Sequence, residues 1–127
     1  MPSVLIIDDN RQMADSLGQI VTMLGLEARI AYGARTGIIM LKQTLPDVVF
    51  LDVNMPGVDG FEVFAYLRRL PEMKNVPVIV ITSDDQPETA QKARDTGVLA
   101  MIIKPASVES IEAALKVAGA LPLYFIS

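Results

Sequence analysis

The feature that most constrains this chain is a set of short apolar runs, each apolar at nearly every position. The runs are Val4–Ile7, Val48–Val53, Val78–Ile81 and Ala100–Ile103, and Glu27–Ala31 is a further strand candidate between the first two. A strand with one face in water alternates apolar and polar residues, so a strand that is apolar throughout must be covered on both faces. These runs therefore predict a parallel sheet with helices on both sides.

The segments between the runs carry helical signals. In the first segment, Met13, Leu17, Val21 and Leu24 recur at the spacing of one helix face, and Gly25 follows as a helix-ending residue. Five strands and five helices then alternate, and right-handed crossovers place helices on both faces of the sheet, so the predicted fold class is α/β. The expected helices are Gln12–Leu24, Ala34–Thr44, Phe61–Leu70, Pro87–Thr96 and a last one that is capped by Ser107 and runs to about Ala118.

The length of 127 residues fits one domain spanning 1–127. We expect residues 1–118 to form the fold and residues 119–127 to form an apolar tail, because Pro122 ends any helix there and the stretch Leu123–Ile126 is apolar. Such a tail can pack back on the domain, mediate a homodimer or lead into a following domain.

Composition argues against membranes and nucleic acids as direct partners. The apolar runs are far shorter than the roughly 20 residues that a membrane span needs. The opening stretch MPSVLIIDDN lacks a basic leader and a cleavage site, so we expect a cytoplasmic protein. The net charge is −4 with no basic run, which argues against direct nucleic-acid binding.

The missing residue types narrow the chemistry further. The chain has no cysteine, which excludes disulfides and thiolate catalysis, and no histidine, which removes the usual general base and the commonest metal ligand. Any metal site must therefore use oxygen ligands, which favours magnesium, calcium or manganese.

Polar residues follow the apolar runs at the points where the strands end. The carboxyl ends of parallel strands lie along one edge of the sheet, which is where ligands bind in such folds. We therefore expect three carboxylates, a hydroxyl and an ammonium to meet in one shallow site. The residues at these strand ends are Asp8, Asp9, Asp52, Asn54, Thr82, Ser83 and Lys104.

Three carboxylates repel one another in a small volume unless a cation neutralises them. Magnesium binds one or two carboxylates and completes its shell with water and phosphate oxygens. A carboxylate can also attack a phosphoryl group and hold it as an acyl phosphate. The residues at the strand ends therefore include everything that a phospho-aspartate site requires.

Four motifs at these strand ends, IIDDN, LDVNMPGVDG, ITS and IKP, resemble the receiver domain of bacterial two-component response regulators. The resemblance covers nearly the whole chain in order and spacing. It implies a flavodoxin-like open sheet of five parallel strands in the order 2-1-3-4-5. It also implies a cis peptide bond between Lys104 and Pro105, because family members often have a cis bond at this position.

The same resemblance implies a Mg²⁺ site, which Mn²⁺ can also occupy. It makes Asp52 the phosphoacceptor and a metal ligand. Asp9 is the direct ligand of the acidic pair, Asp8 acts largely through water, and the backbone carbonyl of Asn54 also binds the metal.

The remaining implied roles concern the phosphoryl group and the switch. Thr82 carries the hydroxyl that moves toward the phosphoryl group, and Lys104 forms an ion pair with the phosphoryl group. Asn54 and Asp84 occupy the positions that tune hydrolysis of the acyl phosphate. Met101 stands where an aromatic switch residue is common, which puts that half of the usual switch in question.

The resemblance also implies partners. The phosphoryl donor is a sensor histidine kinase or a histidine phosphotransfer protein. The output is a downstream protein or an output domain, read through the face of the fourth helix, fifth strand and fifth helix. We expect no enzyme activity beyond the chain's own phosphorylation and dephosphorylation.

Two alternative functions stay open from the sequence. One is a non-phosphorylated interaction module that keeps the fold. The other is an aspartyl-phosphate phosphatase, because the triplet from Asp52 to Asn54 resembles a D-x-D nucleophile motif, although that motif belongs after a first strand and needs a second acid.

Several residues also have a purely structural interpretation. Asp8 and Asp9 could cap the first helix, whereas a metal-site pair predicts that Asp9→Ala stabilises the metal-free fold and abolishes phosphorylation. Gly60 is expected to have a backbone role in the turn into the third helix. The expected core includes Met13, Leu17, Val21, Phe61, Phe64 and Leu67.

Overall fold

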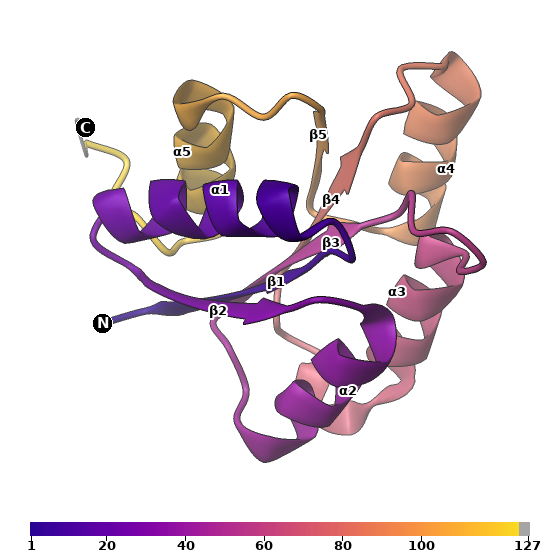
Figure 1. The fold of residues 1–127 in the computed structure, drawn as a ribbon, viewed down its shortest axis with the longest axis horizontal. Helices are drawn as coiled ribbons and strands as arrows, with labels where there is room; N and C mark the ends of the chain where they lie inside the picture. Colours follow the sequence, from indigo (N-terminus) through magenta and orange to yellow (C-terminus); the bar gives the residue numbers. More distant parts are fainter. Residues whose placement is uncertain (125–127) are drawn as a thin grey trace.

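The computed structural model describes residues 1–124, and a five-stranded parallel sheet runs through its centre (Figure 1). The strands are β1 (Ser3–Ile7), β2 (Glu27–Ala31), β3 (Val48–Asp52), β4 (Val78–Thr82) and β5 (Ala100–Ile103). Their order is β2-β1-β3-β4-β5, and every neighbouring pair is parallel. The predicted fold class and strand order are confirmed.

Helices cover both faces of this sheet (Figure 1). They are α1 (Arg11–Met23), α2 (Ala34–Gln43), α3 (Gly60–Arg69), α4 (Pro87–Thr96) and α5 (Val108–Val117), and a short 3₁₀ helix, η1 (Pro71–Met73), follows α3. Helices α1 and α5 pack on one face, and α2, α3 and α4 pack on the other. Across residues 1–124, no helix has both the length and the apolar character to span a membrane.

The central strand β1 shows why the apolar runs have no polar face. Val4 and Ile6 point into the core beneath α1 and α5, whereas Leu5 and Ile7 point into the core beneath α2 and α3. All four side chains are fully buried. Burial of each contributes about 1.5–3 kcal/mol, so a polar residue on either face would be costly.

Several details differ from the sequence-based expectations. The helix boundaries shift by about one residue, which is the usual uncertainty for helix ends. Met13, predicted as core, is half-buried, and the fully buried Ala14 occupies the inward position of α1 instead. Helix η1 was not predicted; it begins at Pro71, just after α3, and buries Met73.

Gly60 has a backbone role, as predicted, but as the first residue of α3 rather than in the turn before it. A Cβ atom at this position would lie 2.3 Å from Cα of Val53. The absence of a side chain therefore lets α3 start directly against the segment that follows β3. The side chain of Asp59 caps this helix by accepting a hydrogen bond from the backbone N–H of Phe61 at 2.9 Å.

The start of the predicted C-terminal tail packs back on the domain. Leu121 is buried in the core beneath α1 and α5. The next apolar residues do not follow it, since Leu123 and Tyr124 are 81% and 84% exposed. The rest of the predicted apolar tail, Phe125 and Ile126, lies outside the described residues.

Candidate functional site

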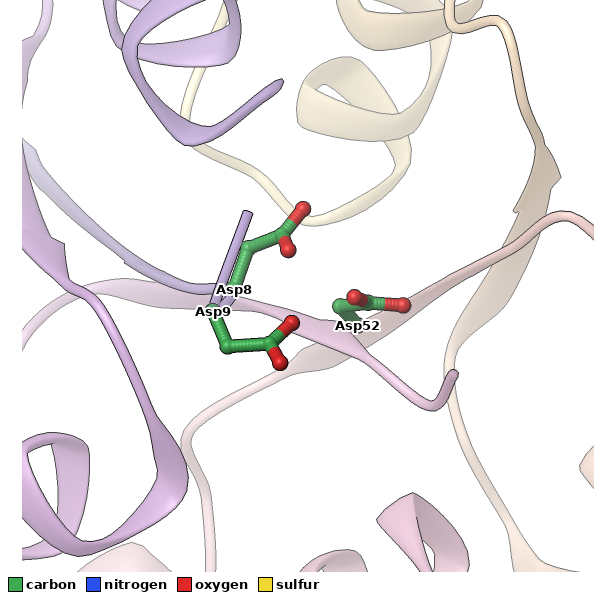
Figure 2. A group of neighbouring side chains, drawn as sticks. All are labelled: Asp8, Asp9 and Asp52. Carbon is green, nitrogen blue, oxygen red and sulfur yellow. The ribbon is translucent and has the colours of Figure 1, made fainter. Parts of the chain in front are cut away.

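Three aspartates meet at the carboxyl edge of the sheet (Figure 2). Asp8 and Asp9 follow β1, and Asp52 is the last residue of β3. One carboxylate oxygen from each lies within 4.8 Å of the others. The parallel pairing of β1 and β3 therefore brings these side chains together, as the sequence predicts.

The two adjacent acids have different surroundings. Asp8 is 1% exposed, and its Oδ1 accepts a hydrogen bond from the backbone N–H of Asn10 at 3.0 Å, whereas Asp9 is exposed. Helix α1 is capped by Asn10, whose side chain accepts from the backbone N–H of Met13 at 3.0 Å. The alternative in which Asp8 and Asp9 cap this helix is therefore wrong.

The charge of Asp8 is poorly solvated. Burial raises the pKa of its carboxyl from 3.8 to about 6, and the neighbouring Asp52 adds to the rise. The backbone hydrogen bond from Asn10 and the charge of Lys104 act in the opposite direction but do not cancel it. A cation close to this carboxylate would restore its ordinary acidity.

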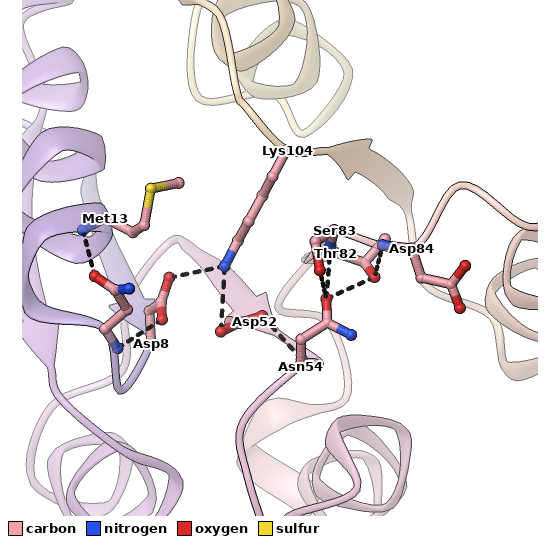
Figure 3. A network of polar contacts seen from close by, with 9 residues as sticks. Asp8, Met13, Asp52, Asn54, Thr82, Ser83, Asp84 and Lys104 are labelled. Carbon is pink, nitrogen blue, oxygen red and sulfur yellow. Dashed lines mark hydrogen bonds and ion pairs between the residues drawn. The ribbon is translucent and has the colours of Figure 1, made fainter.

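Lys104 supplies the ammonium that the sequence predicts for this edge. Its Nζ lies 3.4 Å from Oδ2 of Asp52 and 3.5 Å from Oδ2 of Asp8 (Figure 3). The lysine follows β5, and the peptide bond between it and Pro105 is cis. The side chain is only 15% exposed, so these ion pairs are shielded from solvent more than ordinary surface pairs.

The donor set fits a divalent cation with oxygen ligands. Three carboxylates carry three negative charges when ionised, and Lys104 balances one of them. The remaining two charges equal the charge of Mg²⁺ or Mn²⁺, and carboxylate oxygens are the ligands that these ions prefer. Ionising the buried Asp8 carboxyl costs free energy, because Asn10 and Lys104 do not cancel the rise of its pKa. A bound cation would remove this cost.

Asn54 connects Asp52 with the end of β4. Its backbone N–H donates to Oδ1 of Asp52 at 2.9 Å. Its side-chain oxygen accepts from the Thr82 hydroxyl at 2.8 Å and from the backbone N–H of Ser83 at 2.6 Å (Figure 3). Sequence reasoning missed this side-chain contact, since the partners lie 28 and 29 positions apart and no local pattern relates them.

Asp84 does not bring its carboxylate to Asn54. Figure 3 shows the carboxylate pointing away, and it accepts from the backbone N–H of Gln86 at 2.9 Å and from the hydroxyl of Thr89. The hydrogen bond from Thr89, followed by that from Gln86, lowers the pKa of Asp84. The two side chains expected to tune hydrolysis together are therefore not assembled as a pair here.

Met101 lies half-buried on β5. It packs against the small apolar cluster of Phe61, Val80 and Ala93, beneath α4. The position expected to carry the aromatic half of the switch is thus filled by a flexible side chain that already contacts this cluster.

Nearly the whole chain is similar to known proteins. A family model described as the response regulator receiver domain matches residues 4–116. The DNA-binding dual master transcriptional regulator RpaA of Synechocystis is 32% identical over 91% of this chain and 48% of its own length. Protein PilH of Pseudomonas aeruginosa is 29% identical over 87% of this chain and 92% of its own length. The chain spans about half the length of the first curated relatives that it matches.

Solved structures agree with this match. The chemotaxis protein CheY4 of Vibrio cholerae superposes with a TM-score of 0.85 at 27% identity, covering 91% of this chain and 97% of CheY4. The signal receiver domain of a DNA-binding response regulator from Colwellia psychrerythraea gives a TM-score of 0.84 at 30% identity, covering 91% of this chain and 96% of that one.

Proposed function

Because the chain belongs to the response regulator receiver domain family of two-component systems, we propose that it is a signalling switch phosphorylated on Asp52. The observation that carries this proposal is the position of the Asp52 carboxylate. It is 3% exposed, its Oδ2 lies 3.4 Å from the ammonium of Lys104, and it shares a cluster with Asp8 and Asp9.

In the proposed reaction, a carboxylate oxygen of Asp52 attacks the phosphorus of a phosphohistidine on a partner protein. The O–P bond forms as the P–N bond breaks, and the imidazole nitrogen keeps the bonding electron pair and takes up a proton. The donor is a sensor histidine kinase or a histidine phosphotransfer protein. The chain contains no histidine and cannot itself be this donor.

The residues of the site would divide the remaining work. The carboxylates of Asp8, Asp9 and Asp52, together with the backbone carbonyl of Asn54, would hold Mg²⁺ or Mn²⁺. When bound, the ion neutralises charge on the phosphoryl oxygens. Lys104 already contacts Asp52 and would pair with the acyl phosphate that forms there.

The product carries more negative charge than the unmodified site, and this charge shifts the balance between two conformations of the domain. We place the output on the face formed by α4, β5 and α5. A downstream protein or an output domain would bind this face. RpaA, whose name describes a DNA-binding transcriptional regulator, is about twice as long as the region that this chain matches.

The test is incubation with acetyl phosphate and Mg²⁺ followed by intact-mass measurement. The wild type should gain one phosphoryl group, and EDTA should prevent the gain. Asp52→Asn should show no adduct. Asp47→Asn is the matched control, because Asp47 lies just before the opposite end of β3 and instead accepts from the backbone N–H of Ser3 at 2.7 Å.

The other outcomes identify the alternatives. No adduct on the wild type, together with no Mg²⁺ binding at millimolar metal, would contradict the proposal and favour a non-phosphorylated interaction module. Turnover of a phosphomonoester would favour a phosphatase. An undiminished adduct on Asp52→Asn would place the phosphoacceptor elsewhere.

A further inference from the structure

The amide side chain of Asn54 makes more contacts than a metal site needs from this residue. Its Oδ1 accepts from the Thr82 hydroxyl at 2.8 Å, from the Ser83 backbone N–H at 2.6 Å and from the Ser83 hydroxyl at 3.2 Å (Figure 3). A backbone N–H can only donate, so Ser83 determines that the amide oxygen, and not its nitrogen, faces the end of β4. An amide oxygen has two lone pairs, and three donors saturate it.

The only hydrogen-bond donor of the Thr82 hydroxyl is already used. The residue is fully buried, and its hydroxyl oxygen also accepts from the backbone N–H of Asp84 at 3.0 Å. A hydroxyl has one hydrogen, and that hydrogen is directed at Asn54. Thr82 therefore cannot donate to a group on Asp52 until its bond to Asn54 breaks.

Building on the proposed phosphorylation of Asp52, we propose that the Asn54 amide oxygen is a latch that holds the Thr82 hydroxyl until the phosphoryl group takes its place as acceptor. A phosphoryl group presents three strong acceptor oxygens. Hydrogen bonds to charged acceptors are about twice as strong as those between neutral groups. The exchange of the neutral Asn54 oxygen for a phosphoryl oxygen is therefore favourable. Its free-energy cost is the breaking of the hydrogen bond between Thr82 and Asn54.

The contacts of Asp84 carry this exchange to α4. Its backbone N–H is bonded to Thr82, and its carboxylate is bonded to the hydroxyl of Thr89 in the first turn of α4. In the part of the chain that the structure describes, α4 buries only Ala93. A movement of Thr82 can therefore pull the start of a weakly anchored helix, and this route does not need an aromatic residue at Met101.

The latch is tested with beryllofluoride as a probe for the phosphoryl group, at saturating Mg²⁺, by ¹⁹F NMR or calorimetry. Asn54→Ala should bind the probe about fivefold more tightly than the wild type, a factor that corresponds to one ordinary net hydrogen bond. Ser83→Ala is the matched control: it removes a donor from the same oxygen but leaves the bond to Thr82, so its affinity should stay within about twofold.

A double-mutant cycle isolates the hydroxyl. In a Thr82→Ala background, Asn54→Ala should no longer tighten binding, because no hydroxyl remains to be released. Two results would overturn the latch while leaving the proposed phosphorylation intact. One is an equal gain in probe affinity from Asn54→Ala with and without the Thr82 hydroxyl, and the other is no gain when Thr82 is present. Failure of the wild type to bind the probe would overturn the proposed function as well.

Amide NMR tests the connection to α4. In Asn54→Ala without ligand, the signals of Asp84 and Thr89 should shift toward their positions in the probe-bound wild type. Adding Thr89→Val to Asn54→Ala should remove this shift at the start of α4, while the tighter binding of the probe remains. Signals that stay at the unliganded wild-type positions in Asn54→Ala would contradict the connection.

Discussion

Replacing Asp8 by asparagine should stabilise the metal-free domain at neutral pH, and the gain should vanish in acid. Asparagine has nearly the shape of a protonated aspartate and keeps an oxygen for the backbone N–H of Asn10, which now donates to Asp8 at 3.0 Å. It lacks the charge that burial makes costly. The substitution therefore isolates the free-energy cost of ionising one side chain.

The size and sign follow from the pKa of Asp8. In the unfolded chain the carboxyl titrates near 3.8, and burial raises the pKa to about 6 in the folded domain. Between these values the folded state holds a proton that the unfolded state has lost, so stability falls as pH rises. The difference of about 2 pH units corresponds to an ionisation cost of about 3 kcal/mol, which is absent below pH 3.8 and reaches its full size well above pH 6.

The assay is urea unfolding of the wild type and Asp8→Asn in EDTA, from pH 4 to pH 8. The variant should be more stable by about 3 kcal/mol at pH 8, or about 10 °C in Tm, and the gap should close near pH 4. Glu72→Gln, which removes an exposed acid, is the control and should leave stability within about 0.5 kcal/mol of the wild type at pH 8. A gap that is constant across pH, or a variant less stable at pH 8, would refute the reasoning.

Two further predictions concern Gly60 and Asp9. Gly60→Ala should destabilise the domain by about 1–3 kcal/mol in chemical denaturation, because the new Cβ would lie 2.3 Å from Cα of Val53. Gly33→Ala, which precedes α2 and meets nothing within 4 Å, is its control, and equal effects would contradict the close approach. Asp9→Ala should change metal-free stability by less than about 0.5 kcal/mol, since Asp9 is exposed, yet abolish Mg²⁺ binding followed by calorimetry. Undiminished Mg²⁺ affinity would exclude it as a ligand.

The last of these predictions revises an expectation from the sequence. The adjacency of Asp8 and Asp9 indicates that the pair is costly without metal, but it does not say which residue bears the cost. Alternation along the strand and the position of the following turn bury Asp8 and expose Asp9. The stabilisation expected for Asp9→Ala therefore belongs to Asp8.

The meeting of Asp8, Asp52 and Lys104 could be predicted because parallel strands share a carboxyl edge. Each strand is recognisable from its apolar run, so the residues that follow the runs must lie together. This inference needs no knowledge of side-chain conformation, and the ion pairs of Lys104 with both acids agree with it.

The contacts of Asn54 could not be predicted in this way. Its amide reaches Thr82, the last residue of β4, because the loop that follows β3 adopts a particular conformation, and loop conformations depend on packing rather than on periodicity. The same holds for Asp84, whose carboxylate satisfies the start of α4 and turns away from the site. The position of a residue at a strand end thus predicts which residues lie near it, but not which of them it hydrogen-bonds.

The most direct test of the central claim is chemical identification of the phosphorylated residue. Borohydride reduces an acyl phosphate of aspartate to homoserine, so treatment after incubation with acetyl phosphate and Mg²⁺ marks the site for peptide mass spectrometry. We predict homoserine at position 52 alone, and none when EDTA is present. Homoserine at another aspartate, or at none in a sample that carries a phosphoryl adduct, would contradict the assignment of Asp52.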